Sequence, residues 1–264
     1  MSSYDFILDG IRFSHSSAKT YETCAYSFKL TYIDSLRKEG EDNFYSDYGN
    51  LVHECFEKFF RDELDVFELS QYYRDNYDRI VIHNAPPENY GLGDKYREQG
   101  QVFFDNFYFD KSLYKILLVE DKIDFPLEGF TMTARPDLVL QEIETGKNIM
   151  FDYKTATPYW VGKDGKEKED KKKTEGYYKQ MHIYTYALRN FKNMNIDEIS
   201  LWYPRLSKIV TIPWEIEKEN EAMEWLKDIV KRIKEDEQFM FDNSSPYFCN
   251  NICSVRKFCE FKGD

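Results

Sequence analysis

The stretch ARPDLVLQEIETGKNIMFDYKT, residues 134–155, decides the fold, because it predicts two strands joined by a turn. Residues 132–142 alternate and are rich in β-forming side chains, and residues 148–155 resume that pattern. Between the two runs, Glu144-Thr145-Gly146-Lys147 supplies typical turn chemistry. A β-hairpin is therefore expected here.

This hairpin carries two carboxylates and an amine among apolar neighbours. A turn centred between Thr145 and Gly146 would set Asp137 opposite Lys154 and diagonal to Asp152. Asp152 and Lys154 are two residues apart on one strand, so their side chains point to the same face. The three polar side chains are therefore expected to converge.

Two carboxylates held this close repel each other unless a cation lies between them. Oxygen ligands suit Mg²⁺ or Mn²⁺, which also keep waters and can accept a phosphate oxygen. A lysine beside such an ion can orient the attacking water or stabilise charge on phosphorus. A surface hairpin with one cross-strand ion pair is the simpler alternative. The full set, Pro-Asp followed by Asp-x-Lys after fourteen intervening residues, favours the metal site.

Pro136-Asp137 and Asp152-Tyr153-Lys154 form the signature of the PD-(D/E)XK nucleases, which the chain resembles. It resembles their RecB-type branch in two further motifs on predicted helices. These are G-x-x-x-H before the hairpin, at Gly49 and His53, and Q-x-x-x-Y after it, at Gln180 and Tyr184. The four motifs run in the expected order from Gly49 to Tyr184.

The resemblance implies a ligand set for the metal. Asp137 and Asp152 would bind Mg²⁺ or Mn²⁺ with help from His53 and the backbone carbonyl of Tyr153. Glu120, on the preceding predicted strand, is either a further ligand or an exposed residue.

The resemblance also implies catalytic roles. Asp137 and Asp152 would serve through the metal, and Lys154 would act on the water or the transition state. Gln180 and Tyr184, one helical turn apart, would position the DNA strand or orient Lys154.

Cysteine spacing carries a second resemblance. Cys24 lies near the start of the chain, and Cys249, Cys253 and Cys259 cluster at the end. This pattern is similar to the iron–sulfur staple of AddB-like and CRISPR-adaptation nucleases, in which four thiolates hold a [4Fe-4S] cluster. The C-terminal segment is therefore expected to fold back beside the N-terminal helix. The chain departs from that pattern in its x3 spacing between Cys249 and Cys253, and in having Ala25 where proline is common.

The residues are also compatible with three other states of these thiols, namely zinc ligands, disulfides or free buried cysteines. Zinc sites usually contain paired C-x2-C motifs, which this chain lacks. The N-terminal MSSYDFILDGIRF has neither a basic region nor a long apolar run, so a reducing, cytoplasmic setting is expected and disulfides are disfavoured. Cys55 falls on an apolar helix face and is expected in the core.

Net charge argues against a nucleic-acid partner, because 36 basic and 48 acidic residues give −12. The distribution is uneven, since residues 145–180 hold nine lysines and six acids. Within this stretch, GKDGKEKEDKKKTEG (residues 162–176) is expected to be a charged loop. Contact with DNA and simple solvation explain such a loop about equally well.

The expected fold is α/β, with a small mixed sheet flanked by helices; by resemblance it is a restriction-endonuclease-like core. A single domain over residues 1–264 would comprise a mainly helical part (1–110), the core (111–213) and a C-terminal helix with the cysteine cluster segment (214–264). Helices are expected at 15–34, 46–78, 93–107, 175–192 and 217–238. Strands are expected at 115–125, 130–142, 148–155, 197–203 and 207–213.

The sequence thus predicts a metal-dependent deoxyribonuclease, an exonuclease acting on DNA ends or single strands. By resemblance its setting is recombination, repair or processing of foreign DNA, with a helicase, recombination or DNA-capture protein as partner and no membrane. A catalytically quiet DNA-binding or partner-binding subunit of the same fold is the runner-up, and a zinc-stapled interaction protein is the third reading.

Overall fold

The computed structural model describes residues 4–40, 42–241 and 246–261. The chain divides into two compact units. The first unit comprises residues 1–43, 123–134 and 220–264, and the second comprises residues 44–122 and 135–219. Each unit therefore combines segments that are distant in the sequence.

A five-stranded mixed sheet forms the centre of the second unit, with strand order β10-β9-β6-β5-β2. Strands β6 and β9 are parallel, and the other neighbouring pairs are antiparallel. The strands are β2 (Tyr114–Val119), β5 (Leu138–Glu142), β6 (Asn148–Tyr153), β9 (Glu198–Tyr203) and β10 (Lys208–Pro213). The hairpin predicted from residues 134–155 is thus the β5–β6 pair in the middle of this sheet.

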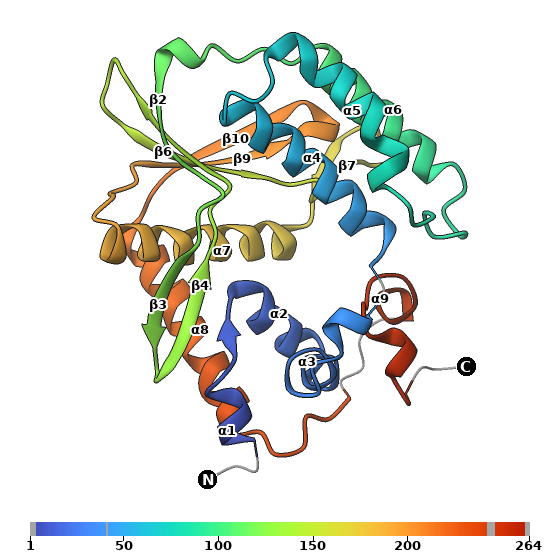
Figure 1. The fold of residues 1–264 in the computed structure, drawn as a ribbon, viewed down its shortest axis with the longest axis vertical. Coiled ribbons are helices and arrows are strands. Elements are labelled where there is room, and N and C mark those ends of the chain that lie inside the picture. Colours follow the sequence, from blue (N-terminus) through green and yellow to red (C-terminus); the bar gives the residue numbers. More distant parts are fainter. Residues whose placement is uncertain (1–3, 41, 242–245, 262–264) are drawn as a thin grey trace. The chain divides into compact units, whose positions relative to one another are not determined.

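Four long helices accompany this sheet, as Figure 1 shows. They are α4 (Phe44–Phe60), α5 (Val66–Ile80), α6 (Leu92–Asp105) and α7 (Lys171–Phe191). A short hairpin of β7 (Tyr159–Val161) and β8 (Glu167–Glu169) connects β6 to α7.

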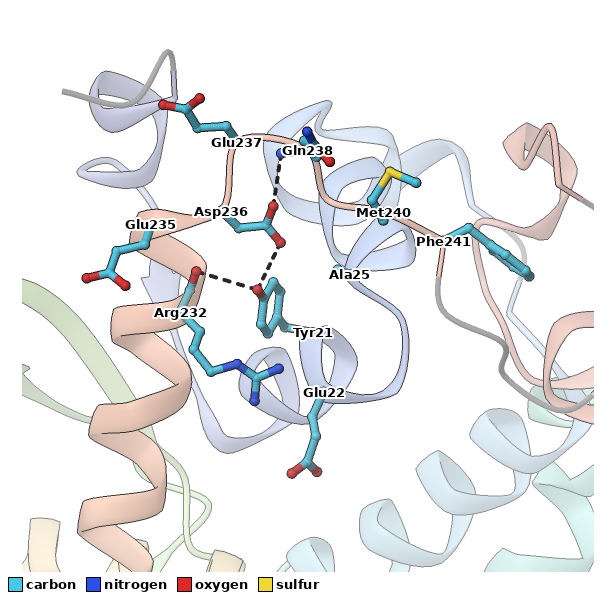
Figure 2. A pocket seen from close by; sticks show the side chains of 10 residues that line it. All are labelled: Tyr21, Glu22, Ala25, Arg232, Glu235, Asp236, Glu237, Gln238, Met240 and Phe241. Atoms are coloured by element: carbon cyan, nitrogen blue, oxygen red, sulfur yellow. Dashed lines mark hydrogen bonds between the residues drawn. The ribbon is translucent and has the colours of Figure 1, made fainter.

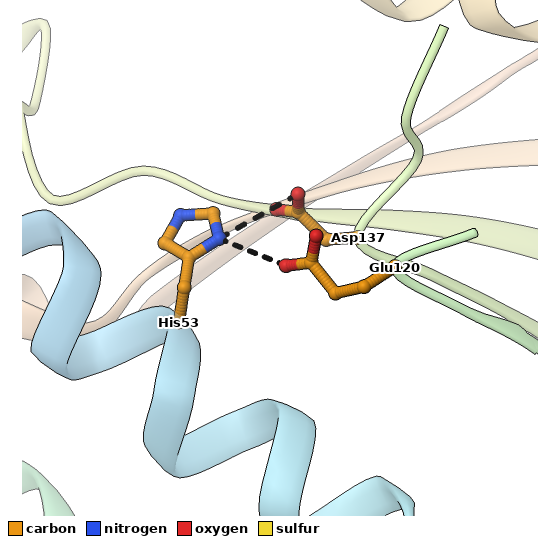
Figure 3. A group of neighbouring side chains, drawn as sticks. All are labelled: His53, Glu120 and Asp137. Carbon is orange, nitrogen blue, oxygen red and sulfur yellow. Dashed lines mark hydrogen bonds and ion pairs between the residues drawn. The ribbon is translucent and has the colours of Figure 1, made fainter. Parts of the chain in front are cut away.

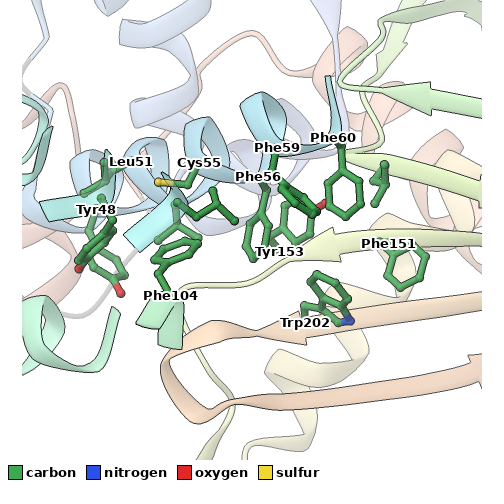
Figure 4. Packing of buried hydrophobic residues seen from close by; sticks show 14 of the residues in the cluster. Tyr48, Leu51, Cys55, Phe56, Phe59, Phe60, Phe104, Phe151, Tyr153 and Trp202 are labelled. Carbon is green, nitrogen blue, oxygen red and sulfur yellow. The ribbon is translucent and has the colours of Figure 1, made fainter. Parts of the chain in front are cut away.

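Aromatic side chains fill the core between α4 and the sheet (Figure 4). The apolar residues of α4 recur every three or four positions, so they form one buried stripe. Phe56 from this stripe stacks on Tyr153 of β6 with 4.1 Å between ring centroids. Trp202 of β9 lies against both rings. This packing fixes the end of β6, where the polar residues of the hairpin begin.

The first unit contains a three-stranded sheet and several short helices. Its sheet has the order β1-β4-β3, with β1 (Arg12–Phe13), β3 (Ile123–Leu127) and β4 (Phe130–Ala134). Its helices are α1 (Asp5–Leu8), α2 (His15–Thr23), α3 (Ala25–Phe28) and α9 (Pro246–Asn251). Helix α8 (Ile216–Glu235) begins in the second unit and continues in the first.

The C-terminal segment packs against the first helices within this unit, as the cysteine spacing predicts (Figure 1). Leu30, Cys253 and Val255 form a small buried cluster. Ser14 caps α2 by accepting a hydrogen bond from the backbone N–H of Ser17, so the helix that ends at Cys24 has a fixed start. The N-terminal helices and the C-terminal segment therefore belong to one unit.

Four expected elements are wrong in their extent. The helix expected at 15–34 is interrupted at Cys24, whose extended backbone separates α2 from α3. The helix expected at 46–78 is two helices, because Asp65 caps α5 in a reciprocal capping box with Glu68. The strand expected at 115–125 is divided between β2 and β3, and the strand expected at 130–142 is divided between β4 and β5. Each pair of strands lies in two different sheets.

The prediction of a charged loop at residues 162–176 is also partly wrong. It contains β8, which pairs with β7, and the turn between these strands places Gly165 at a φ of 74°. Asp170 then caps α7, so this helix begins four residues before the expected position. The connection from β6 to α7 is a defined hairpin.

The predicted fold class is confirmed, since a small mixed sheet lies among helices. None of the helices in the described ranges has both the length and the apolar composition that crossing a bilayer requires.

Replacing Phe56 by alanine tests the role of the aromatic core. Phe56 is fully buried, so we expect the free energy of unfolding to fall by about 3–5 kcal/mol, measured by urea denaturation. Phe67→Ala is the matched control, because Phe67 is 87% exposed; its effect should stay within about 0.5 kcal/mol. Equal losses in the two variants would contradict the assigned core.

Candidate active site

Three carboxylates form a row across three adjacent strands of the larger sheet. Leu138 pairs with Phe151, so one further step in this register sets Asp137 opposite Asp152. The predicted register was wrong by two residues, since it set Asp137 opposite Lys154. An error of two residues leaves every side chain on its expected face, because side chains alternate with a period of two.

Glu120 extends the row on the third strand. Val119 pairs with Leu138, and the next backbone N–H, that of Glu120, donates to the Asp137 carbonyl at 3.0 Å. The register of β2 against β5 shifts by one residue between Ile116 and Leu118. Such a bulge re-aims the side chains that follow it. Without this shift Glu120 would not oppose Asp137.

His53 reaches this row from α4, as Figure 3 shows. Its Nδ1 atom lies 3.3 Å from Glu120 Oε1 and 3.6 Å from Asp137 Oδ1. Its Nε2 atom donates to the Tyr153 carbonyl at 3.0 Å. The Tyr153 N–H in turn donates to Asp137 Oδ2 at 2.7 Å. The hairpin backbone therefore connects the imidazole to the carboxylates.

Electrostatic coupling perturbs two of these groups. Burial lowers the pKa of His53, but the charges of Asp137, Glu120 and Asp152 outweigh it and raise that pKa to about 9. Burial raises the pKa of Asp137 to about 7, with Asp152 and Glu120 adding to the shift and His53 and Lys154 opposing it. The cluster therefore holds more negative charge than its burial favours.

Lys154 joins the row to helix α7. Its Nζ atom lies 2.6 Å from Asp152 Oδ2 and donates to Gln180 Oε1 at 2.9 Å. Gln180 Nε2 donates to the Tyr184 hydroxyl at 2.8 Å. The Lys154 ammonium also lies 4.8 Å from the ring centre of Tyr177. Lys154 is thus held by one carboxylate and two residues of α7.

The geometry fits a divalent cation. Ligand atoms of His53, Glu120 and Asp137 all lie within 4.8 Å of one another, the only such group of three in the part of the chain that the structure describes. Asp152 stands outside this group beside Lys154, and its buried Oδ2 accepts no hydrogen bond of ordinary geometry from the described residues. Carboxylates, an imidazole and a carbonyl are ligands suited to Mg²⁺ or Mn²⁺.

Two residues of this site carry weak signals in the sequence. The sequence leaves open whether Glu120 is a metal ligand or an exposed residue. In the structure its side chain is only 8% exposed. Arg135 belongs to none of the sequence motifs, but its Nε atom donates to the Glu120 carbonyl at 3.0 Å and lies 2.9 Å from Glu120 Oε2. Its place directly before Pro136-Asp137 is the one sequence feature that points to it.

Gly49 has more room than its motif suggests. A Cβ atom built on Gly49 would meet only the Thr155 hydroxyl, at 3.6 Å, which is an ordinary van der Waals contact. Close approach of the backbone therefore does not require glycine at this position.

The four cysteines at the two ends of the chain line one small cavity of the first unit. Cys24 and Cys253 are buried, and Cys249 and Cys259 are partly exposed. Burial raises the pKa of Cys259, and the other three thiols add to the shift. The fifth cysteine, Cys55, lies in the aromatic core of the second unit.

A larger cavity of about 620 Å³ lies elsewhere in the first unit (Figure 2). The Tyr21 hydroxyl donates to Asp236 Oδ2 at 2.9 Å on its wall. The lining has four acidic residues, namely Glu22, Glu235, Asp236 and Glu237, against one basic residue, Arg232, so it is net negative. This charge repels phosphate, so the cavity does not suit a nucleic acid.

Comparison with known families identifies one match. The family described as "PD-(D/E)XK nuclease superfamily" matches residues 12–260. That range includes the row of carboxylates, His53 and all four cysteines of the small cavity. The match also confirms the restriction-endonuclease-like core expected from the sequence.

A solved structure gives a consistent fold. A crystal structure from Eubacterium rectale, of a protein described as "Putative exonuclease", has 15% sequence identity and a TM-score of 0.53, over 100% of this chain and 95% of that chain. A structure described as "SSO0001" has 14% identity over 82% of this chain and 86% of that chain, with a TM-score of 0.33 that supports no further argument. Comparison with curated proteins gives no match.

Metal binding should stabilise the protein through the row of acids. At about 100 times its dissociation constant, Mn²⁺ would add about 2.7 kcal/mol, which raises the melting temperature by several degrees. Asp137→Asn and Glu120→Gln should lose most of this shift in scanning fluorimetry, because each removes a ligand charge. Glu175→Gln, an exposed acid on α7, should keep it. A full shift in Asp137→Asn would place the ion elsewhere.

Proposed function

The chain belongs to the PD-(D/E)XK nuclease superfamily, and from that premise we propose that it is a metal-dependent deoxyribonuclease acting as an exonuclease on DNA ends or single strands. The observation that carries this proposal is the row of Glu120, Asp137 and Asp152 with Lys154 beside it. A structural role alone would leave the burial of these acids unexplained, since buried like charges destabilise a fold.

His53, Glu120, Asp137 and the Tyr153 carbonyl would hold Mg²⁺ or Mn²⁺, with Asp152 at the edge of the set. The ion would supply Lewis-acid polarisation of a phosphate oxygen and a lowered pKa for bound water. The protein contributes the rest. Arg135 fixes the Glu120 carboxylate, and the Tyr153 N–H fixes that of Asp137. These contacts keep the ligands in place before substrate arrives.

Lys154 is the group we propose to act on the attacking water or on charge that develops at phosphorus. Asp152 holds its ammonium from one side and Gln180 from the other. Tyr184 in turn orients the Gln180 amide. Gln180 and Tyr184 are therefore positioning residues for Lys154.

The two helical motifs support a place in the RecB-type branch. His53 of G-x-x-x-H contacts Glu120 and the Tyr153 carbonyl, and Gln180 of Q-x-x-x-Y contacts Lys154. Members of this branch act in recombination, repair or capture of foreign DNA. A helicase or DNA-capture protein is the partner class that this resemblance favours.

We further propose that Cys24, Cys249, Cys253 and Cys259 hold a [4Fe-4S] cluster of structural role. All four line one cavity. Among the described residues, no three of their sulfur atoms lie within 4.8 Å of one another, in contrast to the ligand atoms of His53, Glu120 and Asp137. A single zinc ion would need four sulfurs at about 2.3 Å, hence close together, whereas a cluster binds each thiolate to a different iron and spaces them more widely.

Cleavage assays test the catalytic proposal. End-labelled linear DNA should be shortened in Mg²⁺ or Mn²⁺ and left intact in EDTA, and circular single strands should resist an exonuclease. Asp152→Ala and Lys154→Ala should each lower the rate at least about 100-fold, because one metal or general-base contribution is worth several kcal/mol. Lys172→Ala, exposed on the same helix as Gln180, should retain the rate.

Activity within about tenfold of wild type in Asp152→Ala or Lys154→Ala would contradict the catalytic role assigned to these residues. A wild-type protein that binds DNA but cleaves nothing with either metal would favour the catalytically quiet subunit.

Anaerobic purification tests the cluster. The protein should be brown and contain about four iron atoms per chain, and Cys24→Ser should lose both the colour and thermal stability. Cys55→Ala is the matched control, because Cys55 lies outside the cysteine cavity; it should keep its colour. Colourless protein with one equivalent of zinc would contradict the cluster and leave the nuclease proposal standing.

A further inference from the structure

Two half-buried cations lie close together beyond the row of acids, in the same unit. They are Arg205, in the short helical turn Pro204–Leu206, and Lys173, in the first turn of α7. Neither forms an ion pair with a carboxylate in the described ranges, whereas nearby cations such as Lys154 and Lys208 do. Two unpaired like charges in a protein of net charge −12 need an explanation.

The backbone that follows Asp-x-Lys holds both cations. Arg205 NH1 donates to the Thr155 carbonyl at 3.3 Å, and Lys173 Nζ donates to the Thr157 carbonyl at 3.2 Å. Arg205 Nε also donates to Gln99 Oε1 at 2.9 Å. Its guanidinium stacks on Tyr96, 3.4 Å from the ring centre. Arg205 is thus held by three contacts, and within the described residues its NH2 group donates no side-chain hydrogen bond, so its donors are available to another acceptor.

The two charges act on each other. Burial lowers the pKa of Lys173, and the positive charge of Arg205 lowers it further, while Asp170 opposes the shift. Bringing two cations together costs free energy unless an anion offsets their repulsion. Arginine with a lysine beside it suits a phosphate, since the guanidinium fork binds two of its oxygens.

This pair continues the line of active-site contacts along α7. Lys173, Tyr177, Gln180 and Tyr184 are spaced by four, three and four residues, so they share one face of the helix. Gln180 contacts Lys154 and the Tyr177 hydroxyl donates to the Ala156 carbonyl. Lys173 is seven residues from Gln180, about 10 Å along the helix axis. A DNA strand that passes both Lys154 and Lys173 would therefore contact both places within a few nucleotides.

We propose that Arg205 and Lys173 bind one backbone phosphate of the DNA strand, a few nucleotides from the bond that is cut. The proposal rests on the proposed function, because it takes the row of acids as the cleavage site. It assigns binding to Lys173 and not to its neighbours Lys171 and Lys172, which are exposed. Contact with a phosphate also requires no sequence preference.

Salt dependence of DNA binding tests this phosphate site of Arg205 and Lys173, which we call the clamp. A fluorescein-labelled thymidine 12-mer is titrated with protein in Ca²⁺ at a series of NaCl concentrations, and binding is read by anisotropy. Arg205→Gln and Lys173→Met should each weaken binding several-fold. The double variant should also reduce the slope of log affinity against log salt by about 0.7, the value for one phosphate contact on a single strand, and each single variant should lose part of that amount. Arg205→Lys, which keeps the charge, should retain most of the slope.

Arg97→Gln is the matched control. Arg97 also stacks on a tyrosine, Tyr77, but its guanidinium is paired with Asp78 through contacts of 3.0 and 2.9 Å. Its loss should leave the slope unchanged. Melting temperatures of all variants check that the fold persists, since a purely structural role for Arg205 would lower stability and leave the slope as in wild type.

Failure of the clamp and failure of the nuclease are separable. Wild-type cleavage together with wild-type slopes in Arg205→Gln and Lys173→Met would overturn the clamp alone. Reduced slopes in a protein that cleaves nothing would overturn the nuclease and keep the clamp. Absence of salt-dependent binding by the wild type would also overturn the clamp.

Discussion

Mutual repulsion among Glu120, Asp137 and Asp152 is the constraint on which the second unit depends. Strand pairing fixes the three acids in one row, so they cannot move apart without breaking the sheet. Lys154, Arg135 and His53 each offset part of this charge. A divalent cation would offset it more fully, and a phosphate beside that cation would then be attracted where the bare site repels it.

The hairpin sequence was sufficient to predict much of this arrangement. Alternation in residues 132–155 identifies β5, β6 and their shared face, and Asp152 and Lys154 follow from a spacing of two. The register of Asp137 was wrong by two residues because the turn is centred one residue earlier than Thr145-Gly146 suggests. A shift of two residues leaves each side chain on the same face of its strand, so the three side chains still converge as predicted. Cysteine spacing likewise predicted that the two ends of the chain fold together.

Other features depend on contacts between distant segments, which the local pattern does not contain. The place of Glu120 results from a bulge in β2 and from a positive φ of 56° at Glu120 itself. The apolar runs at 115–125 and 130–142 look continuous, yet each supplies strands to two sheets. Arg205 is separated by 32 residues from Lys173 in the sequence, and only the fold brings both to the carbonyls after Lys154. The start of α5, in contrast, is a local feature, because Asp65 followed three residues later by Glu68 is the pattern of a capping box.

The central claim, that the row of acids is a divalent cation site, is tested most directly by anomalous diffraction from crystals grown with Mn²⁺. We predict one strong manganese peak bounded by His53, Glu120, Asp137 and the Tyr153 carbonyl, at the 2.0–2.3 Å distances typical of oxygen and nitrogen ligands. Crystals with manganese bound at other positions and none at this row, at a concentration that supports cleavage, would contradict the account.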